Sequence, residues 1–223
     1  IGGTETYTYN WTDQDGNAVT ANDQGNLENI GAGTYTAVVT DENGCSDTVT
    51  VEITENEVLE IIENSPSLFT HSGVSCNGQT DGFINITTTG GTQVYTYDWT
   101  DQDGNAVTAN DQGNLENIGA GTYTAVVTDE NGCSDTVTVE ITEPEIGVEV
   151  TEEHSDYTGA GVSCNGQTDG FIYLTATGGT ETYTYDWTDQ DGNAVTANDQ
   201  GNLENIGAGT YTAVVTDENG CSD

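Results

Sequence analysis

Three near-identical segments recur along this chain at a fixed spacing. They begin at Gly2, Gly90 and Gly178, so the repeat is 88 residues long (90 minus 2, or 178 minus 90). Residues 2–47 and 178–223 differ at a single position, where the first has Asn and the second has Asp. A fixed period with near identity is the signature of a repeat array, and this period suits a complete small β domain. We therefore expect a tandem array of such domains.

Each copy contains the stretch GTYTAVVTDENGCSD, at residues 33–47, 121–135 and 209–223. Side chains alternate between two faces along its first half, and Asp-Glu-Asn-Gly follows. Alternation at period two that leads into an Asn-Gly turn predicts a β-hairpin. A second alternating run follows the cysteine, with Val49, Val51 and Ile53 on one face, and completes the hairpin.

One complete repeat contains seven short strand patterns, lettered A, B, C, C′, E, F and G in chain order. In the middle copy they are expected at residues 57–63, 83–88, 95–99, 106–108, 115–118, from 123 onward, and 136–141; the next strand A is expected within 145–152. This pattern predicts an all-β chain of tandem Ig-like or fibronectin-III-like β-sandwich domains in an extended array. Trp99 is expected in the core, and Tyr123 at a tyrosine corner.

The predicted domains do not coincide with the ends of the chain. Residues 1–55 are expected to form a partial Ig-like repeat (strands C to G), residues 56–143 a complete repeat, and residues 144–223 a repeat that lacks most of strand G. Only a few residues separate one domain from the next. Pro144 should stiffen the second linker, whereas Asn56 takes its place in the first.

The charge of the chain excludes several classes of partner. It contains 39 Asp and Glu residues and no Lys or Arg. Without cations the chain cannot neutralise phosphate, so nucleic acid is excluded as a partner, as is anionic lipid held by a basic patch. There is no apolar run long enough to span a membrane. No nucleophile motif surrounds any Ser, Asp or His, so we expect no enzyme activity.

One combination of motifs resembles a known family. Cys-Asn-Gly-Gln-Thr-Asp-Gly at 76–82, then YTYDW, NIGAGTYTAVVTDENGC and VTVEITEP, is similar to the SprB-type repeat of giant cell-surface adhesins in Bacteroidetes. The resemblance covers essentially the whole chain. It implies an extracellular, cell-surface or secreted location, long tandem arrays, and a role in adhesion, gliding or filament formation.

The five cysteines occupy two places in the repeat, and two per repeat in a secreted array predict a disulfide framework. Cys76 and Cys164 lie in the A–B loop, and Cys45, Cys133 and Cys221 lie at the start of strand G. Two pairings stay open. Bonds within each repeat would join Cys76 to Cys133 and Cys164 to Cys221, whereas repeats stacked end to end would join Cys76 to Cys221. Free thiols are a third alternative.

The C–C′ turn is a candidate calcium site because oxygen ligands stand at alternate positions of a tight turn. Calcium is the candidate cofactor, since a bound cation would relieve repulsion among the carboxylates. An ordinary solvated turn explains the same pattern. The candidate ligands in the three copies are Asp13, Asp15 and Asn17; Asp101, Asp103 and Asn105; and Asp189, Asp191 and Asn193.

Short patterns also mark candidate glycosylation sites. Thr48 and Thr136 follow Asp and precede an aliphatic residue, which resembles the O-glycosylation acceptor of Bacteroidetes. Asn10 and Asn85 match the N-glycosylation pattern.

Together these features predict a structural repeat segment of a long extracellular filament or adhesin stalk. The expected partners are neighbouring repeats of the same chain, other copies of the filament, and surface glycans. The alternative is a multivalent ligand-binding module, in which the C–C′–E loops present a glycan-binding or surface-binding site many times.

Overall fold

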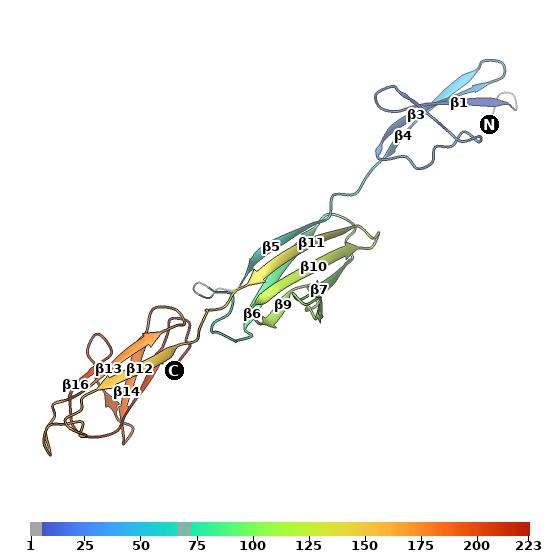
Figure 1. Cartoon of the computed structure of the whole chain (residues 1–223). Coiled ribbons are helices and arrows are strands. Elements are labelled where there is room, and N and C mark those ends of the chain that lie inside the picture. The colour runs from blue at the N-terminus through green and yellow to red at the C-terminus, as the bar shows by residue number, and fades with distance from the viewer. Residues whose placement is uncertain (1–5, 67–68, 70–71) are drawn as a thin grey trace. The chain divides into compact units, whose positions relative to one another are not determined.

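The computed structural model describes residues 6–66, 69 and 72–223, and every regular element in them is a β-strand (Figure 1). The chain divides into two compact units, Ile1–Val58 and Leu59–Asp223. Across the described residues, no helix is long and apolar enough to cross a membrane. The all-β prediction is therefore confirmed.

The described residues of the first unit, 6–58, form one antiparallel sheet with the strand order β2-β1-β3-β4. Its strands are β1 (Tyr7–Thr12), β2 (Ala18–Val19), β3 (Gly33–Asp41) and β4 (Ser46–Ile53). The predicted strand E, residues 27–30, does not form here. The same sequence forms a strand in the second unit by pairing with strand B, and no strand B lies within the described residues of the first unit.

The second unit begins with a two-sheet sandwich. One sheet has the order β5-β6-β9 and the other β11-β10-β7-β8, all antiparallel. The strands are β5 (Glu60–Pro66), β6 (Gly82–Thr89), β7 (Tyr95–Thr100), β8 (Ala106–Val107), β9 (Leu115–Ile118), β10 (Gly121–Asp129) and β11 (Ser134–Ile141). In strand letters the sheets are A-B-E and G-F-C-C′, which is a seven-stranded Ig-like sandwich.

The core of this sandwich lies between its two sheets. Trp99 of β7 packs with Ile84 of β6, Leu115 of β9 and Val127 of β10, all of them fully buried. Trp99 also donates a hydrogen bond from Nε1 to the carbonyl of Gly113, at 2.8 Å. Alternating side chains of both sheets therefore meet on one buried face, as the period-two pattern predicts.

Tyr123 is the tyrosine corner. Its hydroxyl donates a hydrogen bond to the carbonyl of Gly119, four residues earlier, at 3.0 Å. Tyr35 and Tyr211 make the same contact with Gly31 and Gly207 in the other copies. The corner therefore forms even in the first unit, because both of its partners are local in sequence.

A second sandwich follows in the same unit. Its sheets have the orders β12-β13-β16 and β15-β14-β17. The strands are β12 (Glu149–His154), β13 (Gly170–Thr177), β14 (Thr184–Asp189), β15 (Ala194–Val195), β16 (Leu203–Ile206) and β17 (Tyr211–Thr216). Of strand G, a single bridge between Thr216 and Ser222 is present.

The A strands begin inside their predicted ranges and extend beyond them. β5 starts at Glu60 and continues to Pro66, past the range 57–63, and β12 starts at Glu149 and continues to His154, past the range 145–152. Before β12 the chain is held by other contacts: Gly179 donates its N–H to the carbonyl of Ile146, at 2.9 Å. The alternating sequence begins before β12, but pairing with β13 begins only at Glu149.

Candidate functional site: the junction between the two sandwiches of the second unit

The A–B loop of the first sandwich is fixed at both ends. Val74 is fully buried, and its N–H and that of Gly73 donate to the carbonyl of Thr142, at 3.1 and 2.8 Å. Across the loop, Ser75 donates its N–H to Oδ1 of Asp81, at 3.0 Å. The loop therefore presents Cys76 from a rigid frame.

Asp81 stays ionised to a lower pH than an ordinary aspartate. Desolvation raises its pKa, but the hydrogen bonds from the side chain and the backbone of Ser75 outweigh this, so the pKa lies below its usual value. The hydrogen bonds that hold this loop together therefore favour the ionised form of Asp81.

The F–G turn of the second sandwich is organised by Asp217. Its Oδ1 accepts N–H hydrogen bonds from Asn219 and Cys221, at 3.0 and 2.8 Å, and its Oδ2 accepts one from Thr180, at 2.8 Å. Asp217 is buried; desolvation raises its pKa, but these N–H groups outweigh it and hold the pKa below the usual value. A buried carboxylate thus orients Cys221.

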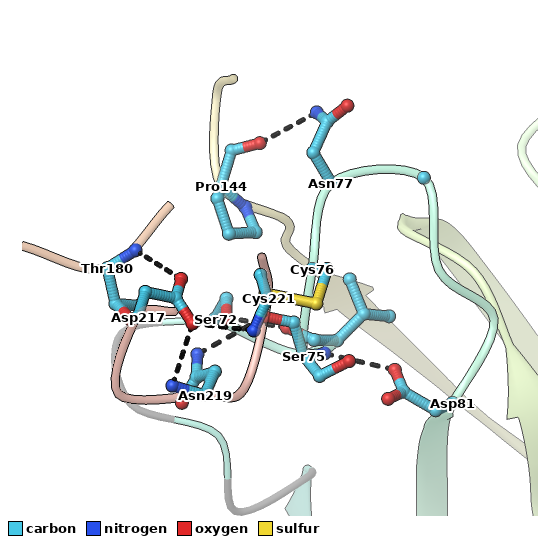
Figure 2. Close-up of a disulfide and its surroundings, with 12 residues drawn as sticks. Ser72, Ser75, Cys76, Asn77, Asp81, Pro144, Thr180, Asp217, Asn219 and Cys221 are labelled. Carbon is cyan, nitrogen blue, oxygen red and sulfur yellow. Dashed lines mark hydrogen bonds between the residues drawn. A yellow bond between two sulfur atoms is a disulfide. The ribbon is translucent and has the colours of Figure 1, made fainter. Parts of the chain in front are cut away.

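The loop and the turn meet at a disulfide bond between Cys76 and Cys221, with their Cα atoms 5.7 Å apart (Figure 2). Asn219 donates a hydrogen bond from Nδ2 to the carbonyl of Ser75, at 3.3 Å. The sulfur of Cys221 lies 3.2 Å from the same oxygen, and Cys221 is buried. The bond joins residues 145 apart in sequence and links one sandwich to the next.

The linker between the sandwiches is held by the same loop. Asn77 donates from Nδ2 to the carbonyl of Pro144, at 2.8 Å, as Figure 2 shows. Gly78 donates its N–H to a carboxylate oxygen of Glu143, at 2.6 Å. We call the loop 72–81, the linker 143–145 and the turn 217–221 together the inter-repeat junction.

The structure selects one of the two cysteine pairings considered above. Cys76 bonds to Cys221, so the pairings within a repeat, Cys76–Cys133 and Cys164–Cys221, are not formed. The A–B loop and the F–G turn that meet belong to consecutive sandwiches, which is the end-to-end alternative. Cys45, Cys133 and Cys164 are free and exposed.

The predicted calcium ligands in the C–C′ turn bind their own backbone. Oδ1 of Asp101 accepts the N–H groups of Asp103 and Asn105, at 2.9 and 2.8 Å, and its Oδ2 accepts Nδ2 of Asn105, at 3.0 Å. The hydrogen bond from the Asn105 side chain is the largest of the effects that lower the pKa of Asp101.

The other two copies of this turn are similar. Oδ1 of Asp13 accepts the N–H groups of Asp15 and Asn17, and Oδ1 of Asp189 accepts those of Asp191 and Asn193. Among the residues that the structure describes, no group of three or more His, Cys, Asp or Glu side chains is arranged to hold a metal. A calcium site here remains a prediction.

The predicted glycosylation sites differ in accessibility. Thr48 and Thr136 are exposed on β4 and β11, and Asn10 is exposed on β1. Asn85 is half-buried in the middle of β6, between two paired strands. These sites also remain predictions.

Sequence reasoning did not find the polar contacts of the junction. Ser75, Asn77, Asn219 and Glu143 bind groups in other segments. The last three belong to the repeated motifs described above, but a motif does not reveal which distant segment its side chains contact. The available signal was the stretch that contains this loop, which is identical at 73–84 and 161–172 although the segments before it differ.

The SprB repeat family model matches the chain at residues 69–104 and 161–192. Both matches include a cysteine-containing A–B loop and strands B and C. The predicted resemblance to a SprB-type repeat is therefore confirmed for these two regions. No curated protein matches the chain.

Three solved structures are similar to the chain at low identity. The N-terminal eight Ig domains of Down Syndrome Cell Adhesion Molecule (DSCAM) isoform 1.30.30 match 97% of this chain at 15% identity and a TM-score of 0.39. Dpr2 Ig1-Ig2 in complex with DIP-Theta Ig1-Ig3 matches 97% at 8% identity and a TM-score of 0.31. A tetra-tandem repeat in the extending region of a large adhesion protein matches 97% at 19% identity and a TM-score of 0.27.

The chain spans 31% of the DSCAM structure, 87% of the Dpr2 structure and 64% of the tetra-tandem repeat. With TM-scores this low, none of the three likenesses bears on what the chain does.

Proposed function

We propose that this chain, which contains SprB-type repeats at residues 69–104 and 161–192, is a structural segment of an adhesin-like protein at the cell surface. In this role its linked sandwiches extend a long stalk outside the cell and carry tension along it. The total absence of Lys and Arg and the lack of a nucleophile motif support a structural role over catalysis.

The observation that carries this proposal is the disulfide between Cys76 and Cys221. It closes a loop of chain between positions 145 apart, which includes strands B to G of the first sandwich, the linker and nearly all of the second sandwich. Tension applied along the chain passes from Cys76 directly to Cys221. Residues 77–220 are therefore off the load path, and of the two sandwiches only strand A of the first (β5) remains on it before the bond.

Single-molecule force spectroscopy on the full chain tests this role. When the disulfide is intact, the fully stretched chain should be shorter by roughly 500 Å, because residues separated by 145 positions at about 3.5 Å each stay looped out. Reduction should restore that length and allow both sandwiches to unfold completely under load. A contour length that is the same before and after reduction would contradict the load-bearing proposal.

Two variants make this experiment specific. Cys76→Ser removes the bond and should give the full contour length even in oxidising buffer. Cys164→Ser removes a cysteine from the identical loop of the other repeat but leaves the Cys76–Cys221 bond, so it should behave like the parent chain.

A second function is favoured by the loop between strands C′ and E. Its Asn-Asp-Gln tip is exposed in every copy, and the loop is closed by the same hydrogen bonds, from the N–H groups of Gln112 and Asn114 to Oδ1 of Asn110, at 3.0 Å, and their equivalents. A surface repeated with one conformation suits multivalent binding of a glycan. Saturable binding on a glycan array that is lost when this loop is replaced would favour this function over a purely structural one.

A further inference from the structure

One half of the inter-repeat junction occurs a second time in the chain. The loop at 163–169 has the same sequence as the loop at 75–81 and the same internal hydrogen bonds. Ser163 donates its N–H to Oδ1 of Asp169 at 3.0 Å, as Ser75 does to Asp81. The loop around Cys164 therefore has the bonded conformation without a bonded partner.

The other half occurs twice more. In the turns at 41–45 and 129–133 the aspartate Oδ1 accepts the N–H groups of the following Asn and Cys at 3.0 and 2.8 Å, the same distances as in the bonded turn at 217–221. Cys45 and Cys133 are free and exposed. Since the internal hydrogen bonds of each half are the same in its bonded and unbonded copies, docking requires little reordering within either half.

Exposure shows what docking does to these surfaces. Ser75 is buried where the turn at 217–221 contacts it, whereas Ser163 in the unbonded loop is exposed. Likewise Cys221 is buried, at 7% exposed, whereas Cys45 and Cys133 are exposed to solvent. The loop at 163–169 is therefore an uncovered copy of a surface that an F–G turn is able to cover.

We propose that the loop around Cys164 is a docking site for the F–G turn of another repeat of this kind, and that a second copy of this chain supplies such a turn through Cys45 or Cys133. Docking places the Asn side chain of the turn (Asn43 or Asn131) against the carbonyl of Ser163, as Asn219 lies against Ser75. A disulfide to Cys164 then makes the contact covalent. This inference rests on the proposed function, because it extends one junction to a continuing series.

The bond forms by thiol–disulfide exchange with a small-molecule disulfide such as oxidised glutathione. The Cys164 thiolate attacks one sulfur of that oxidant and releases one glutathione thiolate, which leaves a mixed disulfide. The thiolate of the docked cysteine attacks the Cys164 sulfur of this mixed disulfide and releases the second. Two protein thiols are oxidised, the oxidant is reduced to two thiols, and the two protons are transferred to the released thiolates.

Oxidation of the purified chain with a glutathione redox buffer at high protein concentration tests the proposal. Non-reducing electrophoresis should show a ladder of covalent oligomers, and mass spectrometry after cleavage at Asp and Glu should show whether the Cys164 peptide is joined to a turn peptide. The three turn peptides have the same sequence, so the cysteine variants below identify the turn that is used. Bonds from Cys164 to Cys45 or Cys133 should exceed the Cys164–Cys164 and turn-to-turn bonds by about tenfold, the factor given by a docking free energy of about 1.4 kcal/mol.

Matched variants separate docking from random oxidation. Cys164→Ser should leave only the minor turn-to-turn bonds, and Cys45→Ser combined with Cys133→Ser only the minor Cys164–Cys164 bonds. Each single turn variant should reduce the ladder less. Asn43→Ala with Asn131→Ala should lower the yield but leave every thiol in place. Symmetric and mixed bonds in random proportion, or no oligomers at all, would overturn the inference.

These results are distinguishable from a failure of the proposed function. The force experiment depends on the Cys76–Cys221 bond within one chain, and Cys164→Ser leaves that bond in place. Protected contour length without selective Cys164 bonds would keep the structural role and reject the second docking site.

Discussion

At the scale of single residues, the loop between strands C′ and E depends on one glycine. Gly113 has φ near +80°, and a Cβ atom there would lie 2.4 Å from the ring of Tyr97. Its carbonyl also accepts the hydrogen bond from Trp99. The backbone of the loop therefore packs directly on two aromatic side chains of β7, where no other residue type fits.

Gly113→Ala should destabilise the first sandwich of the second unit through both of these constraints. The left-handed backbone costs about 1–2 kcal/mol for a residue with a Cβ. The clash with Tyr97 adds about 1–3 kcal/mol of overpacking. Urea unfolding followed by tryptophan fluorescence measures the loss.

Gly104→Ala is the matched control. Gly104 has the same φ of +80°, but nothing lies within 4 Å of a Cβ placed there. It should therefore lose only the backbone contribution of about 1–2 kcal/mol. Equal losses in the two variants would show that contact with Tyr97 does not constrain the loop.

At the scale of elements, each F–G hairpin is held by a buried aspartate. The backbone hydrogen bond from Thr92 is the largest effect on Asp129 and lowers its pKa, and those from Cys133 and Asn131 add to this against desolvation. The carboxylate of one turn residue thus joins the G–F–C–C′ sheet to the B–C turn, through Thr92 at 2.9 Å.

A lowered folded-state pKa predicts the direction of the pH dependence. The ionised form of Asp129 stabilises the fold fully above the unfolded pKa of about 3.9, and that contribution is lost as the pH falls through the lower folded pKa. Asp129→Asn removes the titrating carboxylate. The stability difference between the parent chain and the variant should therefore be largest above about pH 5 and should shrink as the pH falls below about 4.

Chemical unfolding at several pH values measures this difference. Asp103→Asn removes one charge from the exposed C–C′ turn and is the control for the overall change in net charge. If the difference in unfolding free energy between the parent chain and Asp129→Asn stayed constant from neutral to acidic pH, the ionised carboxylate of Asp129 would not be what stabilises the turn.

At the scale of the whole molecule, the formal charge of −39 with no Lys or Arg leaves repulsion among carboxylates uncompensated by side chains. Bound or condensed cations must offset it. We predict that calcium raises the melting temperature more than sodium does at equal ionic strength, and that EDTA reverses the gain. Scanning calorimetry in matched buffers measures the effect.

A variant locates that calcium effect. Replacing Asp15, Asp103 and Asp191 together by Asn removes one candidate ligand from each C–C′ turn while leaving the turn-closing Asp13, Asp101 and Asp189 intact. The calcium-specific gain should fall in this variant. If it persists unchanged, the cation binds elsewhere or acts only by screening.

The sequence by itself was sufficient for the parts of this protein that depend on local patterns. Period-two alternation and the Asn-Gly turn predicted the F–G hairpins, and the spacing of short strands predicted the sandwich. Trp99 and Tyr123 were placed correctly because a core aromatic and a tyrosine corner each have a short-range signal. The spacing of near-identical segments predicted the tandem array before any contact was known.

The rest was decided by contacts between segments far apart in the chain. Strand E needs strand B as its pairing partner. The sequence Leu-Glu-Asn-Ile therefore forms β9 at 115–118 in the second unit and no strand at 27–30 in the first. The pairing of Cys76 stayed open because its two candidate partners, Cys133 and Cys221, lie in identical turns, and no local property distinguishes them. Only the tertiary structure, which brings the A–B loop of one sandwich to the F–G turn of the next, selects Cys221.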